Sequence, residues 1–239
     1  MTWWQIRKAI PTAKITLWFW PRIDSRARRP SLQKRMFDLL PKRSSTWMHR
    51  YKRWSSGRWA FSQLLSEGLK PDDVLVDYGC GTLRMGLHAI RYLAPGNYWG
   101  LDINEKVLEY ASTLASPLAK KTPHLRIISP ASVEEALLAK PALLCSFDVI
   151  QQCDPSGLDE YFSNILKIIG TSGTGIIKAK WSETNTFRFG QGRHFAHSIN
   201  RIGELVSLKG GRLNIVRETD WCSLEGEMGK AGLLRIGSL

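Results

Sequence analysis

The chain has 239 residues and carries 34 Lys and Arg against 21 Asp and Glu, which gives a formal net charge of +13 at pH 7. That length fits one α/β domain with an extension and is too short for two full domains. The four cysteines form no C-x-x-C pair, and no His stands at zinc-ligand spacing. The sequence therefore predicts no metal site and no disulfide framework, and a reducing compartment fits this cysteine usage.

The positive charge is concentrated at the N-terminus. Residues 1–58 hold fifteen Lys and Arg against two acidic residues, whereas residues 59–239 hold nineteen of each kind. Seven of the ten tryptophans also fall within the first 59 residues. We therefore divide the chain into a basic, Trp-rich N-terminal extension over 1–58 and a domain over 59–239. Within the extension, Ser31 is placed to cap a short helix that runs to Leu40.

Three interpretations of the N-terminal extension remain open. Cations interleaved with indole rings fit the anionic headgroups of a membrane surface, and they equally fit RNA, where Arg meets phosphate and rings stack on bases. The third interpretation is a cap on the domain, with solvated Lys and Arg. The apolar run over 15–20 is far shorter than the ~20 residues that span a bilayer, and no signal-peptide cleavage pattern follows it. We expect a cytoplasmic protein without a transmembrane helix, with peripheral membrane contact as an open alternative.

From residue 59 onward, helical and strand patterns alternate along the chain. A helix over 59–67 ends at Gly68, and Ser132 with Glu135 forms a capping-box pattern for a later helix. Such alternation predicts a doubly wound, mostly parallel sheet with helices on both faces. In chain order, the expected strands are 74–78, 98–102, 125–128, 147–151, 175–179, 213–216 and 233–236, and the later helices begin near residues 83, 105, 132, 155 and 199.

The most informative segment joins the first two of these strands. The first strand pattern ends in the sequence DYGCG over residues 77–81, and the spacing of Gly79 and Gly81 lets the backbone turn sharply and lie against a ligand. Asp102 ends the next strand, 21 positions after Gly81. A carboxylate at that place can accept hydrogen bonds from two ribose hydroxyls. The pattern predicts a site for a nucleoside cofactor.

Two cofactor classes compete for this pattern, because NAD-binding units also combine a glycine turn with an acid about 20 residues later. A pyrophosphate cradle needs a third glycine in the order G-x-G-x-x-G, and that position is Arg84 here. Asp77 would also repel a phosphate, whereas it suits a ligand that carries an amino group and a sulfonium. The alternative without any ligand is that Gly79 and Gly81 only turn the chain and that the two acids cap helices.

The segment resembles the first motif of the class I S-adenosylmethionine-dependent methyltransferases, an acidic residue followed by x-G-x-G. The longer string GCGTLRMG over residues 79–86 is similar to a bacterial branch of that superfamily, and the likeness extends over about 71–180. The resemblance implies a Rossmann-like sheet of seven strands, the last two forming an antiparallel hairpin. It also implies S-adenosylmethionine as the cofactor and methyl transfer as the activity.

The resemblance also assigns cofactor contacts by position. It implies that the first motif meets the methionine moiety through side chain and backbone, that Asp102 holds the ribose and that Ile103 stacks against adenine. Cys80 is the small residue inside the turn, and Gln151 opens the loop after the expected fourth strand, at the sheet edge where ligands of such folds bind. The predicted cofactor-binding residues are Asp77, Gly79, Cys80, Gly81, Asp102, Ile103 and Gln151.

Methyl transfer does not require a dedicated catalytic residue, because the sulfonium already makes the methyl group electrophilic and in-line attack chiefly needs alignment. The catalytic residues therefore stay unknown. If the acceptor must lose a proton, the candidates for a general base are His194 and His197, and the alternative for each is a surface or helix-start histidine. The segment over 183–194 is interpreted either as a substrate lid or as an exposed connection.

The sequence after the expected fourth strand narrows the acceptor. Gln151-Gln152-Cys153-Asp154 stands where amino-methylating nucleic-acid enzymes carry Asn or Asp, two prolines and an aromatic residue. Cys153 also lacks the preceding proline of carbon-5 cytosine enzymes. We therefore expect a methyltransferase that acts on a small-molecule, glycan or lipid-linked acceptor. The alternatives are an RNA methyltransferase that uses the N-terminal extension and a non-catalytic, cofactor-binding partner subunit. The oligomeric state is not predicted.

Overall fold

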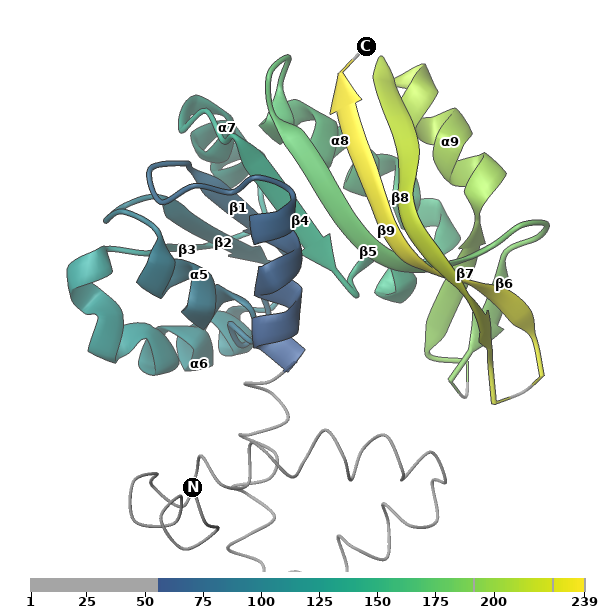
Figure 1. Ribbon diagram of the computed structural model, residues 1–239, viewed down its shortest axis with the longest axis horizontal. Helices are drawn as coiled ribbons and strands as arrows, with labels where there is room; N and C mark the ends of the chain where they lie inside the picture. Colours follow the sequence, from purple (N-terminus) through teal and green to yellow (C-terminus); the bar gives the residue numbers. More distant parts are fainter. Residues whose placement is uncertain (1–55, 191, 225, 239) are drawn as a thin grey trace, which may run out of the picture. The chain divides into compact units, whose positions relative to one another are not determined.

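A computed structural model describes residues 56–190, 192–224 and 226–238 (Figure 1). The described residues belong to one compact unit, which spans residues 53–239. The N-terminal extension, including the helix expected from Ser31 to Leu40, lies outside the described residues.

The domain is built on a mixed sheet whose first five members run parallel in the order β3-β2-β1-β4-β5. β9 then pairs antiparallel with β5, and β8 pairs antiparallel with β9. The doubly wound sheet with an antiparallel last hairpin is therefore confirmed. These seven strands are β1 (Leu75–Tyr78), β2 (Tyr98–Asp102), β3 (His124–Ile127), β4 (Leu143–Phe147), β5 (Thr174–Ser182), β8 (Gly211–Cys222) and β9 (Met228–Ser238).

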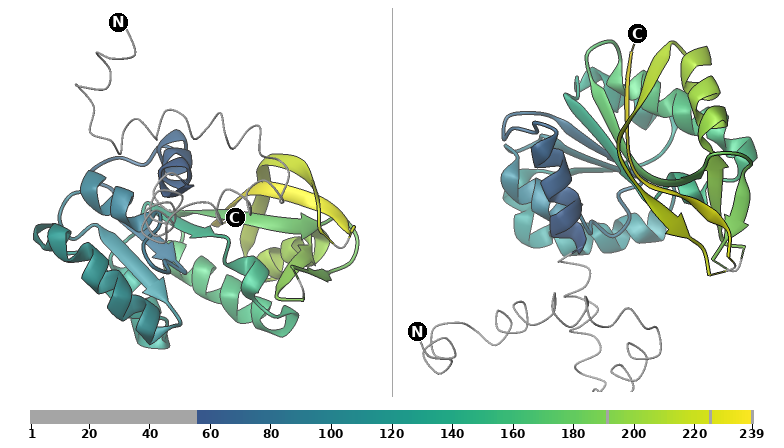
Figure 2. Two further views of the ribbon diagram at one scale, coloured as in Figure 1. Left: turned by 90° about the horizontal axis from the view of Figure 1, so that it is seen from below. Right: turned by 45° about the vertical axis from the view of Figure 1, so that its right-hand side comes forward.

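Helices cover both faces of this sheet, as Figure 1 and Figure 2 show from different sides. Successive side chains of a strand point to opposite faces of the sheet. Leu75 therefore belongs to the apolar core on one face, and Val76 belongs to the core on the other. The Leu75 core packs under a helix over residues 56–66, α5 (Gly86–Tyr92) and α6 (Glu105–Ala115). The Val76 core packs under α7 (Pro130–Leu138), α8 (Leu158–Ile169) and α9 (Ile199–Leu208).

The prediction of a fourth strand over 147–151 is wrong. The strand is Leu143–Phe147, whose first four residues are buried, and it ends because Asp148 adopts a left-handed backbone conformation with φ of +63°. The chain then forms two short 3-10 turns, η2 (Ile150–Gln152) and η3 (Pro155–Gly157), before α8. The loop that follows the fourth strand therefore begins at Asp148 and not at Gln151.

The predicted capping box at Ser132 and Glu135 is wrong as well. α7 begins three residues earlier, because Pro130 occupies its first turn and Ser129 is its N-cap. The Ser129 hydroxyl accepts from the Ser132 backbone N–H at 3.2 Å, and the Ser132 hydroxyl accepts from the Ser129 N–H at 2.9 Å. Ser132 is thus the third helical residue of the box and not its cap.

The segment over 183–194 is not simply a lid or an exposed connection. It contains β6 (Phe187–Phe189) and the start of β7 (His194–Ser198), which pair antiparallel as a hairpin. β7 also pairs in parallel with the last residues of β5, where Trp181 lies opposite His197. The described sheet therefore has nine strands where seven were expected. Within the hairpin, Arg188 lies opposite Phe195 with its guanidinium 4.7 Å from that ring, and Phe189 lies opposite His194 on the other face.

In the described part of the chain, no helix is long and apolar enough to cross a membrane. The same residues contain no group of three or more His, Cys, Asp or Glu placed to hold a metal ion.

Candidate cofactor site

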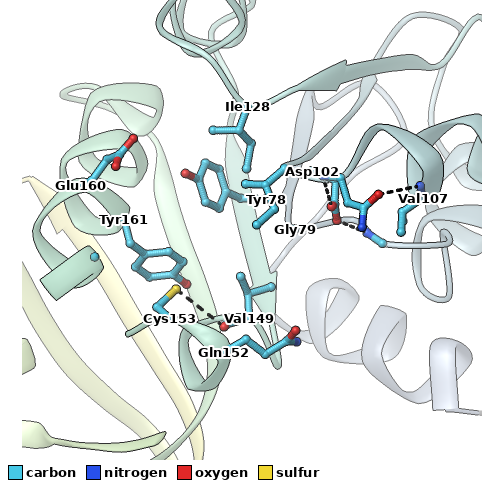
Figure 3. A pocket seen from close by; sticks show the side chains of 14 residues that line it. Tyr78, Gly79, Asp102, Val107, Ile128, Val149, Gln152, Cys153, Glu160 and Tyr161 are labelled. Carbon is cyan, nitrogen blue, oxygen red and sulfur yellow. Dashed lines mark hydrogen bonds between the residues drawn. The ribbon is translucent and has the colours of Figure 1, made fainter. Parts of the chain in front are cut away.

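A cavity of about 490 Å³ opens at the carboxyl ends of β1 and β2 (Figure 3). Its walls come from the loops after β1, β2, β3 and β4 and from the start of α8. Ligands of doubly wound sheets bind at this edge, where the strand order reverses between β1 and β4. The lining residues are Tyr78, Gly79, Gly81, Asp102, Ile103, Asn104, Val107, Ile128, Val149, Gln152, Cys153, Gly157, Glu160 and Tyr161.

The floor of the cavity is the glycine turn after β1. Gly79 and Gly81 have φ of +81° and +52°, a region that side chains other than glycine disfavour. A methyl group on Gly79 would overlap the Val149 side chain, whereas one on Gly81 would meet no atom within 4 Å. Gly79 is therefore required for packing against the loop after β4, and Gly81 leaves open space for a ligand.

Asp102 is held rigidly at the mouth of the turn. Its Oδ2 accepts a hydrogen bond from the Gly81 N–H at 2.9 Å, and its Oδ1 accepts from the Asn104 N–H at 3.0 Å. Because each carboxylate oxygen can accept a further bond, the group remains able to receive two ligand hydroxyls. The Asn104 side chain caps α6 by accepting from the Val107 N–H at 3.3 Å, which fixes the backbone on the other side of Asp102.

Ile103 stands at the rim of the cavity with 80% of its surface exposed. A large apolar side chain held out at the edge of a polar turn gains nothing from the fold itself. Single exposed apolar side chains are common, and Leu208 is exposed to a similar degree, so it is the position of Ile103 on the cavity lining that makes it available to a ligand.

Asp77 does not line the cavity but supports the turn from behind. Its carboxyl is buried and accepts hydrogen bonds from the Tyr98 hydroxyl at 2.7 Å and from the Cys145 thiol at 3.6 Å. Burial raises the pKa of Asp77 to about 6, although the bond from Tyr98 acts in the opposite direction. Gly86, at the end of the GCGTLRMG string, is required here because a methyl group on it would overlap the Tyr98 hydroxyl. Contact of Asp77 with a methionine moiety stays a prediction that this placement does not favour.

Cys80 and Gln151 also lie away from the lining residues. Cys80 is buried against Gly100, and burial raises the pKa of its thiol, which makes it an inert part of the turn. Gln151 keeps its side-chain oxygen buried without a hydrogen-bond partner, while Gln152 and Cys153 line the cavity instead. The misplaced fourth strand put the first loop residue three positions too late, at Gln151, and contact of Gln151 with a cofactor stays a prediction.

Neither candidate histidine lines the cavity. His197 is fully buried on β7, where its Nε2 lies 3.1 Å from the backbone oxygens of both Ile150 and Cys153. Burial lowers the pKa of His197, and donation to two carbonyls places its proton on Nε2. His197 therefore fastens η2 to the β6–β7 hairpin. His194 packs its ring against Phe189, with 5.4 Å between centroids.

The sequence did not predict the lining residues on the side of the cavity next to α8, among them Tyr78 and Tyr161. The Tyr78 hydroxyl accepts from the Asn164 side chain at 3.0 Å, and its ring meets Tyr161 edge-on at 5.7 Å. The Tyr161 hydroxyl donates to Ser146 at 2.8 Å. In the sequence, Tyr161 belongs to the apolar face of α8, and nothing in that pattern separates a core residue from one that also borders a cavity.

A charged cluster joins the glycine turn to the ends of β4 and β5. Asp148 accepts from Lys178 Nζ at 2.7 and 2.8 Å and from Arg84 Nη2 at 3.0 Å. Burial alone would raise the pKa of Asp148, but the hydrogen bonds and charges of Lys178 and Arg84 outweigh burial and lower it. Arg84 stands where a dinucleotide-binding pattern would have its third glycine, and here its side chain links the glycine turn to the loop after β4.

No protein-family model and no curated protein matches the sequence. Solved structures do match the fold. One is a SAM-dependent methyltransferase from Methanosarcina mazei, 13% identical with a TM-score of 0.53 over 74% of this chain and 97% of that one. Another, from Clostridium acetobutylicum, is 16% identical with a TM-score of 0.53 over 79% and 92%.

The fold is that of the S-adenosylmethionine-dependent methyltransferases. A third structure with this fold is magnesium protoporphyrin IX methyltransferase from Synechocystis with bound SAH, 15% identical with a TM-score of 0.53 over 79% of this chain and 85% of that one. At such identities the likeness concerns the fold, and function has to be argued from the cavity itself.

Proposed function

We propose that the chain is an S-adenosylmethionine-dependent methyltransferase and that its cofactor occupies the cavity at the ends of β1 and β2. The observation that carries this proposal is the Asp102 carboxylate, held by two backbone N–H groups between the open Gly81 turn and the exposed Ile103. One group thus offers free acceptor positions for ribose, and its neighbour offers an uncovered apolar surface for adenine. The Synechocystis enzyme of the same fold binds SAH, which supports this choice of ligand.

The size and walls of the cavity fit a ligand of this kind. A volume of about 490 Å³ falls within the roughly 300–1,000 Å³ of ordinary ligand pockets. With the ribose on Asp102 and adenine on Ile103, the methionine moiety would extend along the Gly79–Gly81 turn toward Val149 and Gln152. When bound, S-adenosylmethionine supplies an electrophilic methyl group. The protein's own residues then have to bind and orient, because in-line transfer needs alignment more than acid–base chemistry.

The acceptor in this proposal is a small-molecule, glycan or lipid-linked compound. Contacts of the N-terminal extension with a membrane or with RNA remain predictions from its charge and tryptophans, and peripheral location at a membrane remains one too. Salt-sensitive RNA binding that is lost on removing residues 1–58 would favour RNA methylation instead.

Calorimetric titration of S-adenosylmethionine into the full chain tests the proposal. We expect micromolar binding by the wild type, no binding of NAD, and about tenfold or greater weakening in Asp102→Asn, because a charged acceptor of ligand hydroxyls is lost. Asp159→Asn is the matched control, because Asp159 on α8 pairs with Lys209 at the end of α9 and does not line the cavity, so the variant should not affect affinity. Failure of the folded wild type to bind S-adenosylmethionine would refute the proposal.

A further inference from the structure

Two half-buried lysines project from the carboxyl half of β5 onto one face of the sheet. Lys178 and Lys180 alternate with Ile177, Ala179 and Trp181, which are buried in the core under α8 and α9. The lysines therefore face the side of the helix over 56–66, and Lys178 Nζ lies 5.5 Å from the Trp59 ring centroid on that helix. Lysines on an interior sheet face are rarely retained without a partner.

The two lysines differ in what neutralises them. Lys178 makes two short hydrogen bonds to the Asp148 carboxylate. Lys180 Nζ instead lies 4.1 Å from the Trp221 ring centroid and 4.8 Å from the Phe189 ring centroid. Among the residues that the structure describes, no carboxylate pairs with Lys180. We call Lys180, Phe189 and Trp221 the lysine–aromatic cluster.

The lysine–aromatic cluster leaves a positive charge partly uncompensated. Two aromatic faces attract a cation, but they carry no net negative charge that would neutralise it. Burial accordingly lowers the pKa of Lys180. Arg84 and Lys178 both pair with Asp148, so Lys180 is the cation of this group that no ion pair neutralises among the described residues.

The lysine–aromatic cluster also lies next to the candidate cofactor site. The Asp148 N–H donates to the Lys178 backbone oxygen at 3.0 Å, and the following residue, Val149, lines the cavity. Lys180 lies two residues further along β5, toward the carboxyl edge where ligands of such sheets bind. β7 pairs with the end of β5 immediately beyond it, so the β6–β7 hairpin and β8 bring Phe189 and Trp221 to this place (Figure 1).

We propose that Lys180 binds an anionic group of the methyl acceptor, a carboxylate or a phosphate, and that Phe189 and Trp221 contact the apolar part beside it. This inference rests on the proposed function and narrows it to amphipathic, anionic acceptors. The ammonium supplies the charge, and the rings exclude water from one side of the ion pair, which strengthens it. The charge of Asp148 also acts on Lys180, but the hydrogen bonds of Asp148 go to Lys178 and Arg84.

The test uses benzoate and phenyl phosphate as probes, with benzamide as the uncharged control, titrated into the full chain and followed by ligand-observed NMR. We expect millimolar binding of at least one anionic probe by the wild type and weaker binding of benzamide. Lys180→Gln should weaken the anionic probe by about tenfold or more, and Lys180→Arg should retain most of the affinity because it retains the charge. Lys167→Gln is the matched control, because Lys167 on α8 makes an exposed ion pair with Glu134 on α7.

The titrations include SAH, so that the two proposals fail separately. Binding of SAH by Lys180→Gln at wild-type affinity shows that the variant is folded. If the variant then binds the anionic probes as well as the wild type does, or if the wild type binds neither probe, the acceptor inference is overturned while the cofactor proposal stands. Lys180-dependent binding of a probe without any SAH binding would support the anion site and refute methyl transfer.

Discussion

The two halves of the sheet edge that form the candidate site are built in different ways. The half at β1 and β2 is fixed mainly by the backbone: two glycines with positive φ, and a carboxylate that accepts N–H bonds from Gly81 and Asn104. The half at β4 and β5 is held by side chains from distant segments, such as Arg84 on Asp148 and His197 on η2. If the proposed function holds, the backbone-defined half would hold the cofactor, and the half held by side chains would meet the acceptor.

The largest expected effect comes from breaking the backbone-defined half at Gly79. Gly79→Ala combines an unfavourable left-handed φ, about 1–2 kcal/mol, with overlap against Val149, about 1–3 kcal/mol. We expect a loss of about 4 kcal/mol in the free energy of unfolding, measured by urea denaturation. Gly68→Ala is the control, because Gly68 shares the positive φ but would meet no atom within 4 Å.

The same experiment separates the two causes. Adding Val149→Ala to Gly79→Ala should recover part of the lost stability by removing the overlap but not the backbone strain. Equal losses of unfolding free energy in Gly79→Ala and Gly68→Ala would show that the close packing of the turn against the loop after β4 does not contribute to stability.

A smaller effect is expected at Asp77, behind the same turn. Because burial raises its pKa from 3.8 to about 6, the folded state holds a proton that the unfolded state releases between these pH values. The stability associated with protonated Asp77 is therefore fully present below about pH 4 and is lost as the pH rises through 6, by about 3 kcal/mol in total. Asp77→Asn, which keeps an acceptor for Tyr98, should remove this loss.

Denaturant titrations at pH 4 to 7 check the Asp77 prediction. The variant should gain stability relative to the wild type over that interval, and it should become the more stable protein near neutral pH. Parallel pH profiles for the two proteins would contradict the buried, protonated carboxyl.

The smallest of the three effects is expected in the half held by side chains. His197→Phe keeps an aromatic ring but leaves the Cys153 carbonyl oxygen without its donor and the Ile150 carbonyl oxygen with the Cys153 N–H alone, at a cost of about 2 kcal/mol. Amide hydrogen exchange over residues 150–153 should become faster, because η2 is no longer tied to β7. His124→Phe is the control, since His124 is half-buried and stacks on Trp99. Unchanged exchange in His197→Phe would contradict the assigned positioning role.

The difference between the two halves also explains what the sequence could predict. The glycine turn and the starts of α6 near residue 105 and of α9 near residue 199 depend on neighbouring residues, and the structure has all three as expected. Asp102 lies 21 positions from Gly81, a separation that the strand–helix–strand unit itself determines. Local rules are sufficient for this half of the site.

The other half could not be predicted by the same reasoning. The end of β4 depends on the left-handed Asp148, whose conformation is held by Lys178, 30 residues away. The environment of Lys180 depends on Trp221, which only the β8–β9 pairing brings near. Such contacts leave no periodic pattern in the sequence, and for that reason the β6–β7 hairpin was expected as a loop.

A crystal structure of the full chain with SAH tests the central claim most directly. We predict that both ribose hydroxyls contact the Asp102 carboxylate, that adenine covers Ile103, and that the homocysteine moiety follows the turn from Gly81 toward Val149. A ligand bound elsewhere in the domain, or bound in the cavity without contact to Asp102, would contradict the account.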